Sequence, residues 1–217
     1  MKSNLFLRVI SVLISVFVWQ EAYSAEISPI TAQEWAEEKG RLLIDTFQEP
    51  NVSLRYQKLD SLFNQYIDVP YIARFVVGKY WRQMSSEQQR EYLQVFHRYA
   101  LALYKTFPLD FVDNIKYRIS GATPEGDFII VNAVVSVNLS PNEPATDFLL
   151  SFRLHQVAED IKLVDIKLAE SSLLLSFRGK FYEMISALEG EMEWFIEDLT
   201  LMTQNAESHN QTKLSNI

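Results

Sequence analysis

The spacing of apolar residues changes twice along this chain, and this change constrains the fold more than any other feature. From Thr31 to about Phe107 apolar residues recur at steps of three and four, as in amphipathic helices. Between residues 115 and 168 they alternate with polar residues, as in half-buried strands. Helical spacing returns after Ser171. Helices on either side of a block of strands indicate an α+β domain.

The part of the sequence before the strands contains recognisable signals for the starts of helices. Thr31 with Glu34, and Ser85 with Gln88, have the spacing of capping boxes, in which each side chain reaches the other's backbone N–H. Asp68 is placed to cap a short apolar helix that has Pro70 near its first position. The expected helices begin at Thr31 (with a weakness at Gly40), span 52–66, run from Asp68 into Gly78, and extend from Ser85 to about Phe107.

Four strands are expected at 115–119, 127–139, 148–154 and 161–168, with turns at 121–126 and 141–144. Short turns between successive strands predict a curved antiparallel four-stranded sheet. The N- and C-terminal helices can cover the same face of this sheet, enclosing a layer that is solid or hollow. The last helix is expected from Ser171 or Ser172 to about Thr203, interrupted at Gly190, and the polar residues 204–217 predict a disordered tail.

Residues 1–24 have the layout of a secretory signal peptide. Lys2 and Arg8 precede an uncharged apolar run, Val9–Trp19, and small residues follow, with cleavage expected after Ser24 or Ala25. An uncleaved membrane anchor is the alternative, but the run is too short to span a bilayer. No Cys stands at the cleavage region for a lipoprotein anchor. An exported domain over residues 25–203 is therefore expected.

The charge of the mature chain excludes some partners. Removing Lys2, Arg8 and Glu21 leaves 18 of 20 basic and 27 of 28 acidic side chains, a net charge of −9. Such a chain of about 190 residues forms one domain with a real core and is a poor ligand for nucleic acid. The chain has no cysteine, so the core must hold the fold without disulfides.

Few residues suggest a catalytic or metal site. His97, His155 and His209 are not in a metal-ligand spacing, and the sequence has neither a phosphate-binding loop nor a Gly-x-Ser-x-Gly elbow. Asp165 is unusual because it lies between Val164 and Ile166 in an expected strand, where an unpaired charge is costly to bury. It is interpreted as a structural carboxylate, on the outer face or paired with Arg178, rather than as a general base.

The apolar stripes leave two interpretations open. A stripe at helical spacing usually belongs to a core, but aromatic residues make up 13% of this chain and nearly every expected element has a long apolar face. A hydrophobic ligand cavity is therefore the alternative to a solid core.

Two sequence blocks have a recognisable pattern. The first block is Tyr71–Arg82 followed by Ser86–Gln89 and the helix with Phe96. The second is Leu163–Ile166 followed by Ser172-Leu173 and Ser176–Phe181. Together they resemble the MlaC family, the periplasmic phospholipid-binding or toluene-tolerance proteins of Gram-negative bacteria. The resemblance extends from about Thr31 to Thr203.

The resemblance implies a single α+β domain that encloses a lipid pocket and has no catalytic residues. It implies a monomeric carrier, with bound phospholipid as cargo and no cofactor. The carrier would move lipid between an inner-membrane ABC transporter complex with an MCE-domain ring and an outer-membrane lipoprotein–porin complex, and so maintain outer-membrane lipid asymmetry.

By matched position and inward-facing spacing, one set of apolar residues is expected to bind the lipid. Lys79, Arg82 and Arg90 are candidates for partner contacts, although a solvated helix face explains them equally well. Asp165 is expected to pair with Arg178 and hold the last helix over the pocket. The expected lipid-binding residues are Phe75, Val76, Tyr80, Trp81, Phe96, Tyr104, Val131, Val135, Leu150, Phe152, Val164, Ile166, Leu173 and Leu174.

Two other classes of function remain open. One is an enzyme built on a small open α+β barrel and acting on an apolar substrate, which would need a titratable pair deep in the pocket. The other is a periplasmic interaction adaptor with a solid core and no cavity.

Overall fold

The computed structural model describes residues 27–106, 115–138 and 144–215. The expected signal peptide lies outside these residues. Within the described ranges, no helix is both long enough and apolar enough to cross a membrane.

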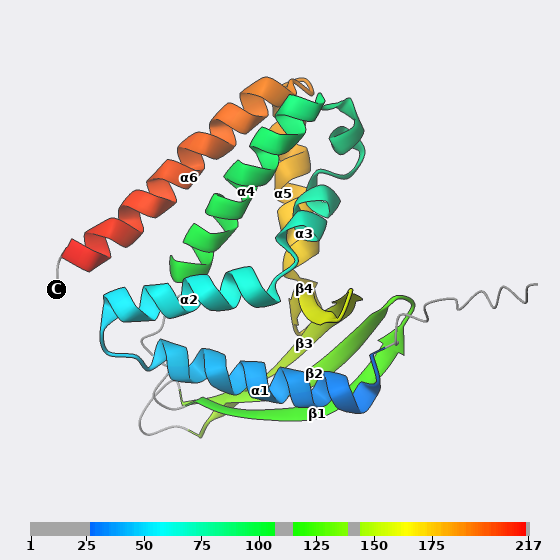
Figure 1. Ribbon diagram of the computed structural model, residues 1–217, viewed down its shortest axis with the longest axis vertical. Helices are drawn as coiled ribbons and strands as arrows, with labels where there is room; N and C mark the ends of the chain where they lie inside the picture. Colours follow the sequence, from blue (N-terminus) through cyan, green and yellow to red (C-terminus); the bar gives the residue numbers. More distant parts are fainter. Residues whose placement is uncertain (1–26, 107–114, 139–143, 216–217) are drawn as a thin grey trace, which may run out of the picture.

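The helices form two groups along the chain, with the strands between them (Figure 1). They are α1 (Pro29–Phe47), α2 (Val52–Tyr66), α3 (Val69–Val77), a 3-10 helix η1 (Gly78–Gln83), α4 (Ser86–Thr106), α5 (Leu173–Ala187) and α6 (Met192–Ser215).

Local capping explains most helix starts. The capping box before α4 is confirmed, because the Gln88 N–H donates to Ser85 Oγ (3.1 Å) and the Ser85 N–H donates to Gln88 Oε1 (2.9 Å). Asp68 caps α3 as expected. The capping box predicted at Thr31 is wrong: α1 begins at Pro29, and Ser28 accepts a hydrogen bond from the Thr31 N–H (3.1 Å).

The sheet is antiparallel, with its strands in chain order: β1 (Ile115–Glu125), β2 (Phe128–Val137), β3 (Thr146–Val157), β4 (Asp160–Leu168) and β5 (Ser171–Ser172). This confirms the α+β class, although the sheet has five strands instead of four. The turn predicted at 121–126 is also wrong for most of its length. β1 continues past an irregularity between Ile119 and Gly121 to Glu125, and its Pro124 is tolerated because β1 is an edge strand.

One face of the sheet is covered by α1. Ala32 and Ala36 pack against Ile129, Val131 and Leu154, and we call these five residues the sheet cluster. The close approach depends on Gly40, because a Cβ there would lie 2.6 Å from the Tyr117 ring. The glycine that looked like a weakness in the sequence is thus required for packing.

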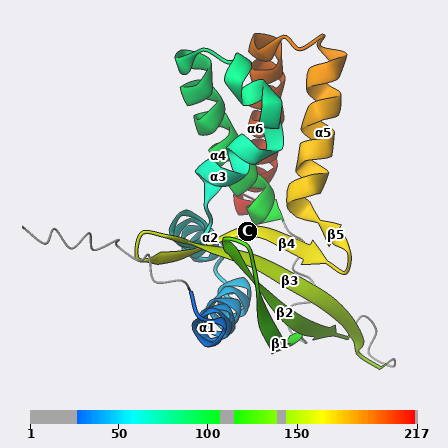
Figure 2. The same ribbon diagram turned by 90° about the vertical axis from the view of Figure 1, so that its right-hand side faces the viewer.

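The opposite face of the sheet, which we call the open face, is less covered. Phe128, Ile130 and Val134 are half-buried there, and Leu149 is 63% exposed. Helices α3 and α5 stand on this side, and α1 lies on the other (Figure 2). The N- and C-terminal helices were expected to cover the same face of the sheet. This holds for α3 and α5, but α1 covers the opposite face.

The larger core lies among the helices. Its biggest fully buried rings are Tyr92, Phe96, Phe181 and Phe195, and we call the apolar cluster around them the helical core. Burial raises the pKa of Tyr92, whose hydroxyl donates to the Ala73 carbonyl (2.8 Å).

The disordered tail predicted for residues 204–217 is wrong over its described part. Helix α6 continues to Ser215 along α4. Arg98 on α4 makes two hydrogen bonds to the Glu207 carboxylate, at 3.0 and 2.6 Å. Asn210 is buried and donates to the Ala102 carbonyl (3.0 Å). These polar contacts with α4 order a segment that lacks an apolar stripe.

Candidate functional site

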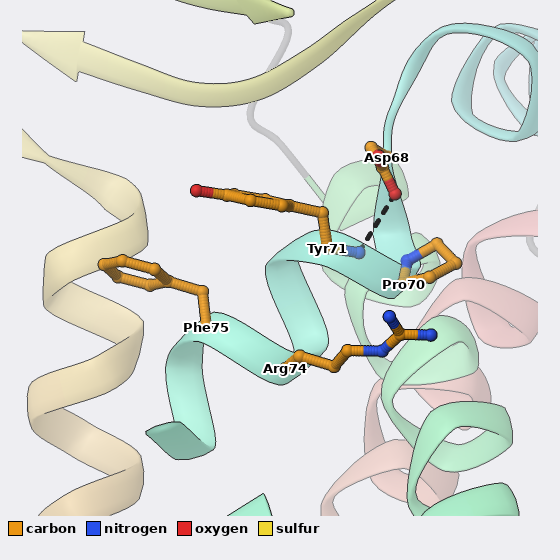
Figure 3. Close-up of a pocket in the computed structure, with 5 residues that line it drawn as sticks. All are labelled: Asp68, Pro70, Tyr71, Arg74 and Phe75. Carbon is orange, nitrogen blue, oxygen red and sulfur yellow. Dashed lines mark hydrogen bonds between the residues drawn. The ribbon is translucent and has the colours of Figure 1, made fainter. Parts of the chain in front are cut away.

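A recess of about 460 Å³ runs along α3 and is lined by Asp68, Pro70, Tyr71, Arg74 and Phe75. Tyr71 and Phe75 are one helical turn apart, and their rings stack at 6.3 Å. Both point to the same side of α3, whereas Arg74 points to the other side (Figure 3). Arg74 covers the Trp81 ring instead, 5.5 Å from its centroid. The recess therefore has an aromatic wall that faces α5.

Asp68 joins the start of α3 to the sheet. One carboxylate oxygen accepts from the Tyr71 N–H (2.9 Å), and the other accepts from His155 Nε2 on β3 (2.9 Å). The His155 ring lies 5.2 Å from the Tyr71 ring and stacks on Phe128 of the open face. Burial raises the pKa of Tyr71, so its phenol stays neutral near pH 7. These aromatic contacts place the recess against the sheet.

Arg178 joins the other end of α3 to α5. Its Nη1 donates to the Phe75 carbonyl (3.0 Å), and its guanidinium lies 4.8 Å from the Phe75 ring centroid. Its Nη2 donates to the Tyr182 hydroxyl (3.1 Å). The side chain thus satisfies a carbonyl in the last turn of α3 and covers an aromatic residue of the recess.

A second, wider recess of about 660 Å³ lies between η1 and α5. It is lined by residues of both elements, namely Lys79, Tyr80, Tyr182, Glu183, Ser186 and Ala187. The Tyr80 and Tyr182 rings meet edge to face at 5.1 Å. Arg178 touches Phe75 of the first recess and Tyr182 of the second, so it stands between the two.

The predicted pair between Asp165 and Arg178 is wrong. Asp165 is buried, accepts from the Ser172 hydroxyl (2.6 Å) and from the Leu174 N–H (2.9 Å), and so holds the start of α5 on β4. The interpretation of Asp165 as a structural carboxylate agrees with this arrangement. A buried carboxylate is satisfied here by a hydroxyl and a helix N-terminus, without a cation.

The expected lipid-binding residues fall into several groups in the described part of the chain, and their role in binding lipid stays a prediction. Val76, Phe96 and Leu174 are buried in the helical core, and Phe75, Tyr80, Trp81 and Tyr104 pack against it. By register, Val131, Val135, Leu150, Phe152 and Ile166 share the face that α1 covers. Val164 is buried within β4, and Leu173 is 51% exposed. Of the whole set, Phe75 lines the first recess and Tyr80 lines the second.

Several residues of the two recesses were missed from the sequence. Tyr71 could have been found, because it is four residues before Phe75 on the same helix face. Phe128 and His155 contact the Tyr71 ring from the sheet, and the strand spacing did not assign them to the site. Tyr182 gave no local signal, since its role depends on α3 and α5 lying side by side.

The two recesses offer little reactive chemistry. Within the described ranges, no group of three or more His, Asp or Glu side chains could hold a metal ion. The titratable pair nearest the first recess, Asp68 and His155, is engaged in capping α3 and in holding it to β3.

The fold and the recesses define a class of protein: an α+β domain with an aromatic-walled recess where its helices meet the sheet. The family model of the MlaC protein matches residues 41–200, and the chain belongs to the MlaC family. The chain is also similar in fold to the phospholipid-binding protein from Ralstonia solanacearum, solved in complex with a phospholipid. The TM-score is 0.65 at 19% sequence identity, over 81% of this chain and 98% of that one. No curated protein matches the sequence.

Proposed function

We propose that this protein is a phospholipid-binding carrier of the periplasm. Membership of the MlaC family over residues 41–200 carries the proposal, and the shared fold with a protein solved with bound phospholipid supports it. The first recess adds a physical reason, because its wall of Tyr71 and Phe75 suits an apolar chain better than a polar substrate.

The energetics of lipid transfer fit such a site. Burying roughly 30 methylenes at about 0.8 kcal/mol each removes on the order of 24 kcal/mol of hydrophobic cost relative to water. A lipid in a bilayer already enjoys much the same burial. A carrier therefore needs only an apolar site comparable to the membrane, and exchange with a membrane is close to neutral. Net direction must come from partners that bind the loaded and unloaded carrier differently.

The lipid site is proposed at the seam between α3, α5 and the open face of the sheet. Phe75 and Tyr80 are the members of the expected set that would touch the lipid directly. The other members would form the apolar layers behind them. Leu173, at the exposed start of α5, would lie at the rim.

The transport role follows from the family as a further proposal. After removal of residues 1–24, the domain that begins at residue 25 would act as a monomer, without a cofactor and without catalysing a reaction. It would shuttle phospholipid between an inner-membrane MCE-domain ABC transporter complex and an outer-membrane lipoprotein–porin complex, and would thereby maintain lipid asymmetry. Lys79, Arg82 and Arg90 remain candidates for contacts with these partners.

Native mass spectrometry of the full chain, expressed with its own N-terminus and purified from the periplasm without detergent, tests the proposal. The expected result is an added mass of a diacyl phospholipid that is lost on denaturation. A mass without lipid, unchanged after incubation with phospholipid vesicles, would favour the adaptor alternative. Chemical turnover of the bound lipid would favour the enzyme alternative.

A pair of variants locates the site. Phe75→Ser removes the aromatic wall of the first recess and is expected to lower the lipid-bound fraction. Leu201→Ser changes an apolar residue that is exposed on α6, away from both recesses, and is expected to leave that fraction unchanged. Circular dichroism of both variants confirms that they fold. Equal lipid binding by the folded variants and the unmodified chain would place the lipid elsewhere.

A further inference from the structure

The Tyr182 hydroxyl accepts two hydrogen bonds and finds no acceptor for its own hydrogen among the described residues. Its oxygen accepts from the Lys79 N–H (3.2 Å) and from Arg178 Nη2 (3.1 Å). A phenol oxygen has two lone pairs and one hydrogen, so with both acceptor positions used it can only donate further. The described residues offer this hydrogen no acceptor at hydrogen-bonding distance.

Arg178 brings further unused donors to the same point. A guanidinium has five N–H groups, and two of them donate to the Phe75 carbonyl and to Tyr182. The Phe75 and Tyr182 rings lie 4.8 and 5.1 Å from its central carbon, which fixes its plane. No described carboxylate lies within 4.0 Å of its nitrogens. The cation is oriented in advance but has no carboxylate partner in the described ranges.

Lys79 adds a second cation beside the first. Its ammonium lies 4.9 Å from the Tyr80 ring centroid and 5.9 Å from that of Tyr182, the ring that Arg178 also contacts. Glu183 lines the same recess but forms an ion pair with neither cation in the described structure. Two cations that contact one ring leave a net positive charge at that point, which would attract an anion.

Gly78 makes this convergence of donors possible. Its φ is +50°, a conformation that glycine adopts readily. A Cβ at this position would lie 2.4 Å from the Tyr182 hydroxyl oxygen and 2.7 Å from Arg178 Nη2. No side chain other than hydrogen fits without moving both groups. The backbone at the start of η1 thus leaves room for the Tyr182 hydroxyl and the Arg178 guanidinium.

We propose that Tyr182, Arg178 and Lys79 form an anion subsite that receives a phosphate group, and that this phosphate belongs to the lipid headgroup. A phosphate presents several acceptor oxygens, which matches a hydroxyl, a guanidinium and an ammonium that converge. The subsite borders the second recess, and Arg178 connects it to the aromatic wall of the first. An amphiphile would thus have its acyl part in the first recess and its phosphate in the second. This inference rests on the proposed function.

Competition between two lipids with the same acyl chains tests the subsite. The probes are phosphatidic acid, which has a phosphate, and diacylglycerol, which lacks one, each added in vesicles to the full mature chain and quantified by native mass spectrometry. The unmodified chain is expected to prefer phosphatidic acid. Tyr182→Phe and Arg178→Gln are each expected to reduce this preference roughly tenfold or more, since a hydrogen bond to a charged group is lost.

Matched controls separate the subsite from general damage. Tyr66→Phe removes a hydroxyl on α2, and Arg41→Gln removes an exposed arginine on α1 that pairs with Glu37. Neither residue lines a recess. Both are expected to keep the preference. Adding inorganic phosphate to the lipid competition distinguishes a headgroup phosphate from free phosphate. If millimolar phosphate abolishes the preference for phosphatidic acid, the subsite belongs to free phosphate and the headgroup assignment is overturned. If the preference is unchanged, the headgroup assignment is supported.

The outcomes also distinguish this inference from the proposed function. If both lipids bind equally, or if Tyr182→Phe keeps the full preference, the subsite is wrong although the protein binds lipid. If neither lipid binds, the proposed function itself fails.

Discussion

The helical core and the open face of the sheet both contain large apolar residues, but they bury them to different extents. In the helical core, Phe181 is fully buried and its ring meets those of Phe96 and Phe195 at 5.9 and 5.3 Å. On the open face Phe128 is only half-buried, and Leu149 is 63% exposed. The aromatic residues of this chain are therefore buried mainly among the helices. The two recesses lie at the surface of that core, one along α3 and the other between η1 and α5.

The largest effect on stability is expected in the helical core. Phe181→Ala should lower the free energy of unfolding by about 3–5 kcal/mol, because it removes a ring that four other aromatic residues contact. Leu154→Ala in the sheet cluster is the matched change in the other region. Chemical denaturation followed by circular dichroism should show one transition in both variants, since Asp165 and Asp68 join the regions. Two separate transitions would show that the regions unfold independently.

An intermediate loss of unfolding free energy is expected for changes at Asp165, where the helical core joins the sheet. Asp165→Ala leaves the Ser172 hydroxyl and the Leu174 N–H without their buried acceptor, which should cost about 1–3 kcal/mol. Asp165→Asn keeps an acceptor oxygen of similar size and should lose less. The midpoint of urea denaturation measures both. Equal losses would mean that the charge matters more than the hydrogen bonds.

The smallest effect is expected on the open face. Leu149→Ser should change the free energy of unfolding by no more than about 0.5 kcal/mol, because the side chain is already in contact with water. The same substitution at the fully buried Leu154 should destabilise the protein severely. A large loss at Leu149 would show that the open face is packed in solution and would weaken the comparison.

The sequence predicted those features that depend on neighbouring residues. Helix α2 has the predicted bounds, 52–66, and Asp68, Ser85 and Gln88 cap the helices that they were expected to cap. These signals are readable because a capping side chain acts on backbone groups within a few residues of itself. The change from helical to alternating spacing likewise identified the fold class.

Features that depend on distant residues were missed. The C-terminal end of α6 is held in helical form by the hydrogen bond from Asn210 to the Ala102 carbonyl. Glycine is required at position 40 because the Tyr117 ring packs there. The partner of Arg178 was assigned by charge, but the folded chain offers it a carbonyl and a phenol instead. Phe75 and Tyr80, which were expected to bind lipid, line the two recesses, and their binding of lipid stays a prediction. The position of Tyr182 beside them depends on α3 and α5 lying next to each other.

Helix α3 is tied at both of its ends, and this has a mechanical consequence. Asp68 anchors the first turn to β3 through His155, and Arg178 anchors the last turn to α5 through the Phe75 carbonyl. With both ends fixed, this short helix has little freedom to move relative to β3 or α5. Loss of the Arg178 hydrogen bond would free the C-terminal end of α3, while Asp68 would still hold its first turn to β3. The Phe75 ring, near the freed end, would then be the part of the first recess that moves most.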